Sequence, residues 1–172
     1  IRVLNKISDI VREEMNAIGA QEILMPALLP SEPWEKTGRW QDPGPEVMFQ
    51  FTGAGKKDLG LGWTHEEIVT PLVQKFARSY KDLPVAVYQI QDKFRNELRA
   101  KSGILRGREF NMKDLYSFHL SEEASAAYYE EVRQAYIQIF QRCGIRAIVT
   151  EASGGAFSNI SHEFQMPTES GE

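Results

Sequence analysis

The first residues of the chain carry apolar side chains at spacings of three and four, which predicts an amphipathic helix. The members of this stripe are Leu4, Ile7, Val11, Met15 and Ile18. Gly19 follows at the position where a helix commonly stops. Residues 22–29 are typical of a short extended segment, and since Pro26 cannot donate to a sheet ladder, we expect it at an edge or contact. Residues 30–46 are rich in Pro, Gly and Trp, which predicts an ordered loop.

The next part of the chain predicts a short hairpin followed by a helix. Residues 49–51 and 59–63 are its strands, because a Gly-, Lys- and Asp-rich turn separates them. Thr64 and Glu67 have the spacing of a capping box, so a helix is expected to start at Thr64. The expected apolar stripe of this helix is Ile68, Leu72, Phe76 and Tyr80.

A longer hairpin and a second amphipathic helix complete the pattern. The β-branched and aromatic residues 85–92 predict a strand that continues through residue 97, and residues 109–118 predict its returning partner. Ser121 is expected to cap a long helix that has acids in its first turn. A last strand is predicted at residues 145–150. The helix stripe is Ala124, Tyr128, Val132, Ala135, Ile139 and Cys143.

The order of these elements predicts an α+β fold, an antiparallel sheet flanked by helices. Hairpins build antiparallel sheets, and the apolar stripes of the helices need a sheet face to cover. A chain of 172 residues can bury one sizeable core. No repeat, low-complexity tract or linker divides it, so we expect one domain.

Composition excludes several classes of protein. The formal net charge of −4 is not that of a protein that coats nucleic acid or an anionic membrane. The single cysteine, Cys143, excludes an internal disulfide and indicates a reducing compartment, so a cytoplasmic location is expected. One cysteine and three histidines make a poor zinc-ligand set, and no protein metal site is predicted. The sequence has no signal peptide and no apolar run that could span a membrane.

Positive charge is concentrated between residues 93 and 113. Seven basic residues less two acids leave an excess of five positive charges in this predicted hairpin. An arginine fork binds phosphate with two hydrogen bonds, and Arg95 and Glu97, two residues apart, would share one face of a strand. On charge alone, a solvated hairpin with cross-strand ion pairs is the better interpretation. The basic residues are Lys93, Arg95, Arg99, Lys101, Arg106, Arg108 and Lys113.

The residue order in this hairpin changes that interpretation, because it resembles motif 2 of class II aminoacyl-tRNA synthetases. That motif reads aromatic-Arg-x-Glu, a variable loop, then Arg-x-x-x-Phe. The chain fills it with Phe94-Arg95-Asn96-Glu97 and Arg106-Gly107-Arg108-Glu109-Phe110. The longer run from Lys93 to His119 is similar to prolyl-tRNA synthetases of bacterial type.

Further blocks of the same family follow in family order over the whole chain. Any one block is weak, but five in order are specific. The resemblance therefore makes residues 1–172 part of a class II catalytic domain, with motif 1 at about 19–29 and motif 2 at about 93–118. The blocks besides motif 2 are Gly19 to Pro26, Gly38-Arg39-Trp40, Thr64-His65-Glu66-Glu67, Tyr88-Gln89-Ile90 and Ser161-His162-Glu163-Phe164.

The resemblance implies ATP-dependent activation of L-proline to prolyl-adenylate and its transfer to tRNA(Pro), with Mg²⁺ accompanying the ATP. It implies that Arg95 is the catalytic residue, which holds the α-phosphate and the substrate carboxylate. Glu97 would accept from the adenine amine, Arg106 would reach the tail phosphates, and Phe110 would stack on adenine. Core packing explains Phe110 equally well on pattern alone.

The resemblance also implies a proline pocket and a dimer contact. Thr64 and Glu66 would bind the secondary ammonium of proline, and His162 and Phe164 would line the pocket for its ring. The capping box competes for Thr64, so its two interpretations stand side by side. A homodimer through motif 1 is implied, with Pro26 at the contact.

Three other interpretations stay open on the sequence. A threonyl enzyme would need a zinc site, for which the single cysteine is unsuitable. A catalytically inactive paralogue would bind nucleotide, amino acid or RNA, and a third possibility is a structural dimerisation fragment. Motif 3, an anticodon-binding domain and an editing domain are not found in the 172 residues, which are expected to be inactive alone.

Overall fold

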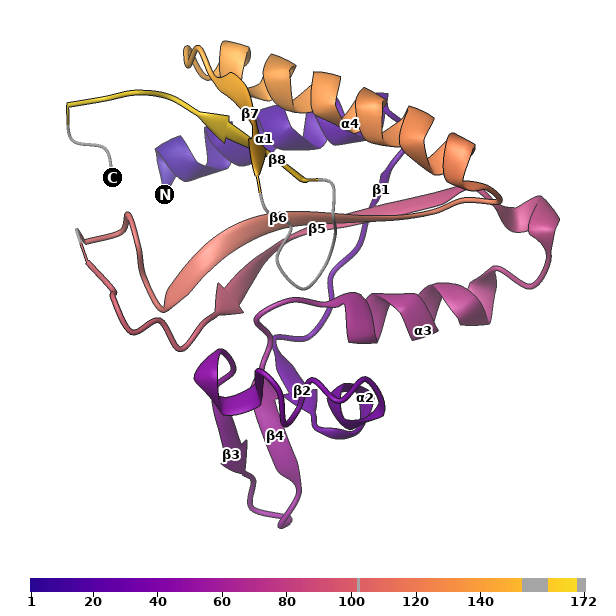
Figure 1. Cartoon of the computed structure of the whole chain (residues 1–172), viewed down its shortest axis with the longest axis vertical. Coiled ribbons are helices and arrows are strands. Elements are labelled where there is room, and N and C mark those ends of the chain that lie inside the picture. Colours follow the sequence, from indigo (N-terminus) through magenta and orange to yellow (C-terminus); the bar gives the residue numbers. More distant parts are fainter. Residues whose placement is uncertain (102, 153–160, 170–172) are drawn as a thin grey trace. The chain divides into compact units, whose positions relative to one another are not determined.

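The computed structural model describes residues 1–101, 103–152 and 161–169. By its internal contacts the chain forms two compact units (Figure 1). The larger unit is Gly19–Ser125, and the smaller one combines Ile1–Ile18 with Ala126–Glu172. The mixture of helices with mainly antiparallel sheets confirms the predicted α+β class.

The first sheet of the larger unit has the order β1-β5-β6 and is dominated by a long hairpin. Its two long strands are antiparallel over ten residue pairs, as the sequence predicted. The two-residue β1 departs from the antiparallel pattern, because it runs parallel to β5. The strands are β1 (Gln21–Glu22), β5 (Val85–Phe94) and β6 (Glu109–Phe118).

The second sheet is antiparallel with the order β2-β4-β3, and it contains the predicted short hairpin. The segment 22–29 does not form one strand, since β1 and β2 belong to different sheets. Pro26 lies between them, where its missing N–H costs no ladder bond. The strands are β2 (Leu28–Pro30), β3 (Gln50–Thr52) and β4 (Asp58–Leu61).

The predicted loop 30–46 contains two short helices, α2 (Glu32–Lys36) and the 3₁₀ helix η1 (Gly44–Glu46). The sequence pattern missed α2 because five residues are too few to show a helical period. A proline in its first turn suits a helix start, since no intrahelical N–H bond is lost there. Trp34 of α2 is fully buried in a cluster with Leu29, Met48 and Trp63.

Helix α3 (Glu66–Phe76) starts two residues later than predicted. The prediction of a capping box formed by Thr64 and Glu67 is wrong. His65 is the N-cap residue and makes no side-chain cap bond. The Thr64 hydroxyl donates to the Glu66 carboxylate instead. The Glu67 carboxylate accepts from Arg39, which gives this buried acid a charged partner that a backbone cap bond would not provide.

The buried face of α3 also differs from the predicted stripe. Val69 and Val73, four residues apart, pack against Val87 of β5, so the helix covers one face of the hairpin (Figure 1). Phe76 is 75 % exposed, and Tyr80 lies beyond the helix in the 3₁₀ helix η2 (Tyr80–Asp82). The β-branched side chains of Val69 and Val73 pack well on the pleated surface of a strand.

The smaller unit joins two long helices and a two-stranded antiparallel sheet. The Arg142 guanidinium of α4 pairs with Glu13 and Glu14 of α1. The predicted α1 is present, and Gly19 follows it with φ +78°. Ser121 caps α4 as predicted, accepting the Ala124 N–H. The elements are α1 (Arg2–Ala17), α4 (Glu122–Arg142), β7 (Ile148–Ala152) and β8 (Ser161–Gln165).

No helix in the parts of the chain that the structure describes is both long and apolar enough to traverse a lipid bilayer.

Candidate functional site

The turn between β4 and α3 carries two of the predicted proline-binding residues. Thr64 is buried, and its hydroxyl holds the Glu66 carboxylate. The Glu66 side chain remains 42 % exposed, so its charge is presented outward from a fixed position. The cap role of Thr64 is thereby excluded, because its hydroxyl donates to Glu66 and not to the start of the helix, and its ligand role stays a prediction.

Arg95 lies just beyond β5, where the chain leaves the ladder. The Phe94 N–H donates to the Gly62 carbonyl at 3.0 Å, and the Arg95 N–H donates to the Arg108 carbonyl at 2.9 Å. The Glu97 N–H then turns back to the Arg95 carbonyl at 2.7 Å. The predicted continuation of the strand to residue 97 is wrong, since this tight turn ends the alternation. Arg95 and Glu97 therefore do not form a same-face strand pair.

The Arg95 guanidinium is the centre of a cluster with Glu66, Glu97 and Phe110. It lies 5.4 Å from the centre of the Phe110 ring. Burial lowers the pKa of Arg95 from its ordinary value, and the charges of Glu66 and Glu97 oppose that shift. The structure thus brings together Arg95, Glu66, Glu97 and Phe110, which come from three segments of the chain. A partly desolvated cation beside a carboxylate can hold both ends of a zwitterion.

Two predicted ATP-binding residues are paired with each other. An Arg106 guanidinium nitrogen lies 3.1 Å from Glu97 Oε2, and the Arg99 N–H donates to Glu97 Oε1 at 2.9 Å. The Arg99 hydrogen bond and then Arg106 lower the pKa of Glu97, so its carboxylate stays an acceptor. An isolated antiparallel β-bridge pairs the backbones of Lys101 and Arg106 in the loop between β5 and β6.

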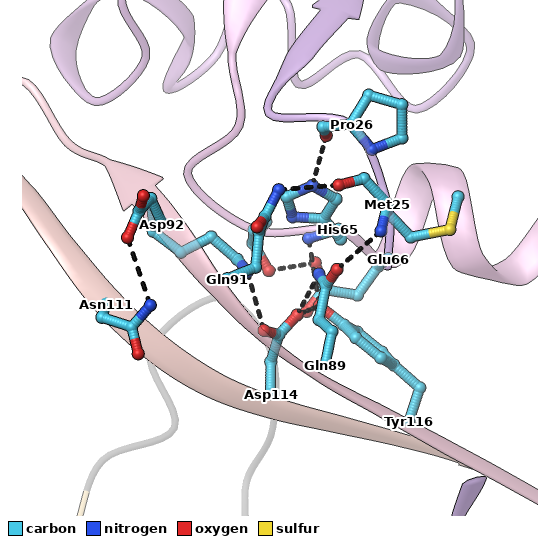
Figure 2. Close-up of polar contacts among 12 residues, drawn as sticks. Met25, Pro26, His65, Glu66, Gln89, Gln91, Asp92, Asn111, Asp114 and Tyr116 are labelled. Carbon is cyan, nitrogen blue, oxygen red and sulfur yellow. Dashed lines mark hydrogen bonds and ion pairs between the residues drawn. The ribbon is translucent and has the colours of Figure 1, made fainter. Parts of the chain in front are cut away.

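A buried polar network underlies the cluster, and its centre is Asp114 of β6 (Figure 2). Lys93 Nζ donates to Asp114 Oδ1 at 2.7 Å, and Gln89 Nε2 donates to Asp114 Oδ2 at 3.0 Å. The Tyr116 hydroxyl also donates to Asp114 Oδ2, at 2.5 Å. Lys93 is fully buried, so this member of the basic hairpin neutralises an internal acid and is not available to phosphate.

The network reaches the proline-binding turn through His65. The His65 N–H donates to the Tyr116 hydroxyl at 3.1 Å, and its ring Nε2 lies 2.9 Å from the Pro26 carbonyl. Burial lowers the pKa of His65. The neutral ring must carry its proton on Nε2, because a carbonyl only accepts. These contacts give His65 a structural role in the turn.

Arg39 is a site residue whose role the sequence did not predict. Its guanidinium donates to Glu67 Oε1 at 2.8 Å, lies 3.7 Å from Glu66 Oε2 and covers the Trp63 ring. Arg39, Glu66 and Glu67 are among the residues that line a cavity of about 670 Å³ between α2 and α3. The sequence feature that could have identified Arg39 is its place in the family block Gly38-Arg39-Trp40.

His162 and Phe164 lie in the smaller unit, on alternate positions of β8. The Tyr129 hydroxyl lies 2.8 Å from His162 Nδ1. The Phe164 ring packs against the Tyr136 and Phe140 rings of α4. Both residues have partners within their own unit, and their place in a proline pocket stays a prediction.

The described residues hold no group of three or more His, Cys, Asp or Glu side chains that could bind a metal ion. Magnesium often keeps its waters and binds through substrate phosphates with one or two carboxylates. The described part of the chain thus offers no dedicated magnesium cage.

Comparison with known proteins identifies the family. Residues 49–171 match the tRNA synthetase class II core domain (G, H, P, S and T). The chain belongs to this class II core family. The match includes motif 2 and the turn that carries Thr64 and Glu66.

Curated relatives of this class II chain are named proline–tRNA ligase. Those of Thermotoga maritima and Streptomyces coelicolor are each 54 % identical over 172 residues, and that of Synechococcus sp. (strain CC9311) is 51 % identical over 174. Each alignment covers 99 % of this chain. The chain spans 30 % of the length of the first two and 29 % of the third.

Solved structures agree on the class II fold. The prolyl-tRNA synthetase of Giardia lamblia, in complex with prolyl-adenylate, superposes with a TM-score of 0.83 at 22 % identity. It covers 93 % of this chain and 33 % of its own. That of Cryptosporidium parvum, with halofuginone and AMPPNP, gives 0.81 at 19 % identity, covering 94 % of this chain and 35 % of its own. At these identities the likeness shows the fold.

Proposed function

We propose that this chain forms the proline- and ATP-binding part of a proline–tRNA ligase, which makes prolyl-adenylate and transfers the prolyl group to tRNA(Pro). The observation that carries the proposal is that the positively charged Arg95 guanidinium and the Glu66 carboxylate lie close enough for the Glu66 charge to act on Arg95. A free amino acid presents a carboxylate and an ammonium group, and these two side chains complement them. The proline–tRNA ligases that are about half identical over the whole chain support proline as the amino acid.

Proline would bind with its ammonium group at Glu66. A secondary ammonium carries two N–H donors, and the Glu66 carboxylate, which Thr64 orients, offers acceptors. Arg95 would face the substrate carboxylate and the α-phosphate of ATP. These two anions repel each other, and the guanidinium reduces that repulsion where they meet.

The chemical step would need no protein nucleophile. A carboxylate oxygen of proline attacks the α-phosphorus and forms the acyl phosphate bond, while the bond to the pyrophosphate oxygen breaks and pyrophosphate leaves. The contribution of the protein is in-line positioning and charge stabilisation. Mg²⁺ would arrive with the phosphates of ATP and neutralise part of their charge.

ATP binding would require the Glu97–Arg106 pair to separate. Arg106 would turn to the phosphate tail, and Glu97 would accept from the adenine amine while Phe110 flanks the base. The pair is 45 % and 23 % exposed at its two side chains, so exchange of partners costs little. The solved relatives with prolyl-adenylate and AMPPNP support this use of the fold.

We further infer a cytoplasmic homodimer that contacts through motif 1, with His162 and Phe164 at the proline ring. Pro26 is exposed while its carbonyl bonds to the His65 ring, and this exposure supports the contact. The free thiol of Cys143 supports the reducing compartment.

Calorimetric titration with a non-hydrolysable prolyl-adenylate analogue tests the proposal, with the threonyl analogue as a control. The full-length protein that carries this sequence should bind the prolyl analogue selectively and should catalyse proline-dependent exchange of pyrophosphate into ATP. Arg95→Ala and Glu66→Ala should each weaken binding by about tenfold or more, since each removes a charged hydrogen-bond partner.

Matched variants on the same unit separate site effects from charge effects. Arg78→Ala and Glu32→Ala remove an exposed arginine and an exposed glutamate outside the cluster, and both should bind like the unchanged protein. Equal binding of the two analogues would contradict the proline assignment. Failure of the full-length protein to bind either analogue would contradict the function itself.

A further inference from the structure

The hairpin below the site contains a charged pair that the proposed chemistry does not use. Lys93 is fully buried and the Asp114 side chain is 12 % exposed. Desolvation of two charges offsets most of their attraction, so such a pair adds little net stability compared with apolar side chains. What the pair supplies is a fixed orientation, since each partner restricts the other to one geometry.

The oriented group is the Tyr116 hydroxyl. It donates to Asp114 Oδ2, which Gln89 also approaches, and it accepts the N–H of His65. Burial and the neighbouring Asp114 charge raise the pKa of Tyr116, so its proton stays in place. Both the donor and the acceptor side of this hydroxyl are therefore defined.

The His65 N–H lies between the two residues that would bind the ammonium group. Thr64 precedes it and Glu66 follows it, and the helix start has no side-chain cap that would fix the turn by other means. From the opposite side, the His65 ring binds the Pro26 carbonyl. Figure 2 shows this chain of contacts from Asp114 through Tyr116 to His65 and Pro26.

The same network is joined to the catalytic arginine by the backbone. Lys93 is two residues before Arg95, and the Phe94 N–H between them donates to the Gly62 carbonyl, next to the turn. A shift of the Asp114 network would move the turn relative to Arg95. The proposed ammonium site at Thr64 and Glu66 would then no longer lie at the right distance from the proposed carboxylate site at Arg95.

We propose that Tyr116 is a positioning residue for proline: through the His65 N–H it holds Thr64 and Glu66 in register with Arg95, and Asp114 and Lys93 fix its hydroxyl. The proposal rests on the proposed function and deepens it. Tyr116 does not touch the substrate. We expect it to act on proline and not on ATP, because the Tyr116 hydroxyl bonds to the turn that would bind proline, whereas Glu97 and Arg106 pair with each other in the loop after β5.

Tyr116→Phe tests the proposal in the full-length protein, by pyrophosphate exchange with proline and ATP varied in turn. Loss of the hydroxyl leaves the His65 N–H without its acceptor, so the turn can move. The KM for proline should rise about tenfold, whereas the KM for ATP should stay within about twofold. Tyr80→Phe, which removes an exposed hydroxyl of the same unit, should change neither value.

A second variant keeps the test decisive if Tyr116→Phe does not fold. Lys93→Met combined with Asp114→Asn removes both buried charges, and the asparagine still accepts from Tyr116. It should raise the KM for proline about threefold and leave the KM for ATP unchanged, because the hydroxyl is less firmly held.

The outcomes separate the two proposals. A folded variant with an unchanged KM for proline, or with both KM values raised equally, overturns the positioning role while proline activation stands. Absence of proline-dependent exchange in the unchanged protein overturns the proposed function instead. A selective rise in the KM for proline supports the inference.

Discussion

Arg95 combines three features that few surface arginines share. It is flanked by two carboxylates, lies over an aromatic ring and is partly desolvated. A fork of fixed direction is suited to two anions at once, which a lysine ammonium cannot bind in the same geometry. The role that we propose for Arg95 therefore depends on shape as well as charge.

Arg95→Lys keeps the charge and loses the planar fork. We expect proline-dependent pyrophosphate exchange in the full-length protein to fall about 100-fold, the scale seen when one oriented charge-stabilising group is removed. Arg78→Lys is the matched control and should keep full activity. An Arg95→Lys protein with nearly unchanged kcat and KM would show that charge alone suffices.

His65 makes the stability of the protein sensitive to mild acid. Its pKa in the folded protein lies below the unfolded value of about 6.5, because burial disfavours the charged ring. Between these two values the unfolded state binds more protons. The stabilising contribution is thus complete above about pH 6.5 and is lost as the pH falls toward the folded pKa.

Denaturant unfolding from pH 8 to pH 5 measures this dependence. The free energy of unfolding should decrease below about pH 6.5, and His65→Gln, which cannot be protonated, should show a shallower decrease. His162→Gln is the comparison, since it replaces a histidine of the other unit. Equal pH profiles for His65→Gln and the unchanged protein would contradict the assignment.

Gly62 shows how closely the backbone approaches His65. A β-carbon at this position would lie 2.7 Å from Cε1 of the His65 ring and 3.2 Å from a Leu29 methyl group. The ring cannot move away without losing its bond to Pro26. Gly62→Ala should therefore lower the free energy of unfolding by about 1–3 kcal/mol. Gly55→Ala, which meets open space, is the control for the same urea titration.

At the scale of elements, the β5–β6 hairpin is the part that sequence predicts best. Its alternation set both strands within a few residues, and its ladder register places Gln89 opposite Asp114. Polar residues at alternate positions, Gln89, Gln91 and Lys93, were a detectable sign of a polar face. Whether that face was buried depended on α3 and the segment around Met25, which bonds to both glutamines.

The buried Lys93–Asp114 pair of this hairpin adds little net stability, but the loss of one partner alone should be costly. Lys93→Met alone leaves Asp114 without its cation, and we expect a loss of about 3–5 kcal/mol in urea unfolding. The combination with Asp114→Asn should restore most of that loss, because no buried charge remains. Asp92→Asn, at an exposed cross-strand pair with Asn111, should change stability by less than about 0.5 kcal/mol. A small effect of Lys93→Met would contradict the pairing.

At the scale of the whole molecule, charge is unevenly distributed. The net charge of −4 combines an excess of +5 in residues 93–113 with −9 elsewhere, since −4 minus 5 is −9. Lys93 is internal, so the outward charge comes from the loop, in which Arg99 is exposed. An anionic partner such as tRNA would be attracted to the positive charge of this loop.

Binding of tRNA(Pro) by the full-length protein should weaken as salt rises. If Arg99 meets a phosphate, Arg99→Ala should reduce the slope of log affinity against log salt by about one. Arg78→Ala should leave the slope unchanged. The measurement is filter binding between 50 and 200 mM salt, roughly the range over which such effects are large. An unaltered slope in Arg99→Ala would exclude that contact.

The sequence by itself determined the longer elements and the strong hairpin, and it supplied the residues that are proposed for the site. These depend on local patterns, because periodicity and motif order are properties of neighbouring positions. Tertiary structure decided what those residues contact. By sequence, Thr64 was suited to cap a helix or to bind the proline ammonium group. In the structure its hydroxyl donates to Glu66, and Glu67 accepts from Arg39 and does not complete a capping box.

The same reason explains the other differences. Phe76 and Tyr80 continue the helical period in the sequence but are exposed in the structure, whereas Val69 and Val73 pack against β5. Lys93 was counted with the basic residues of the hairpin, whereas the structure places Asp114, twenty-one residues away in sequence, against it. Partners brought together by folding are not written in local spacing, so side-chain pairing and burial belong to the tertiary structure.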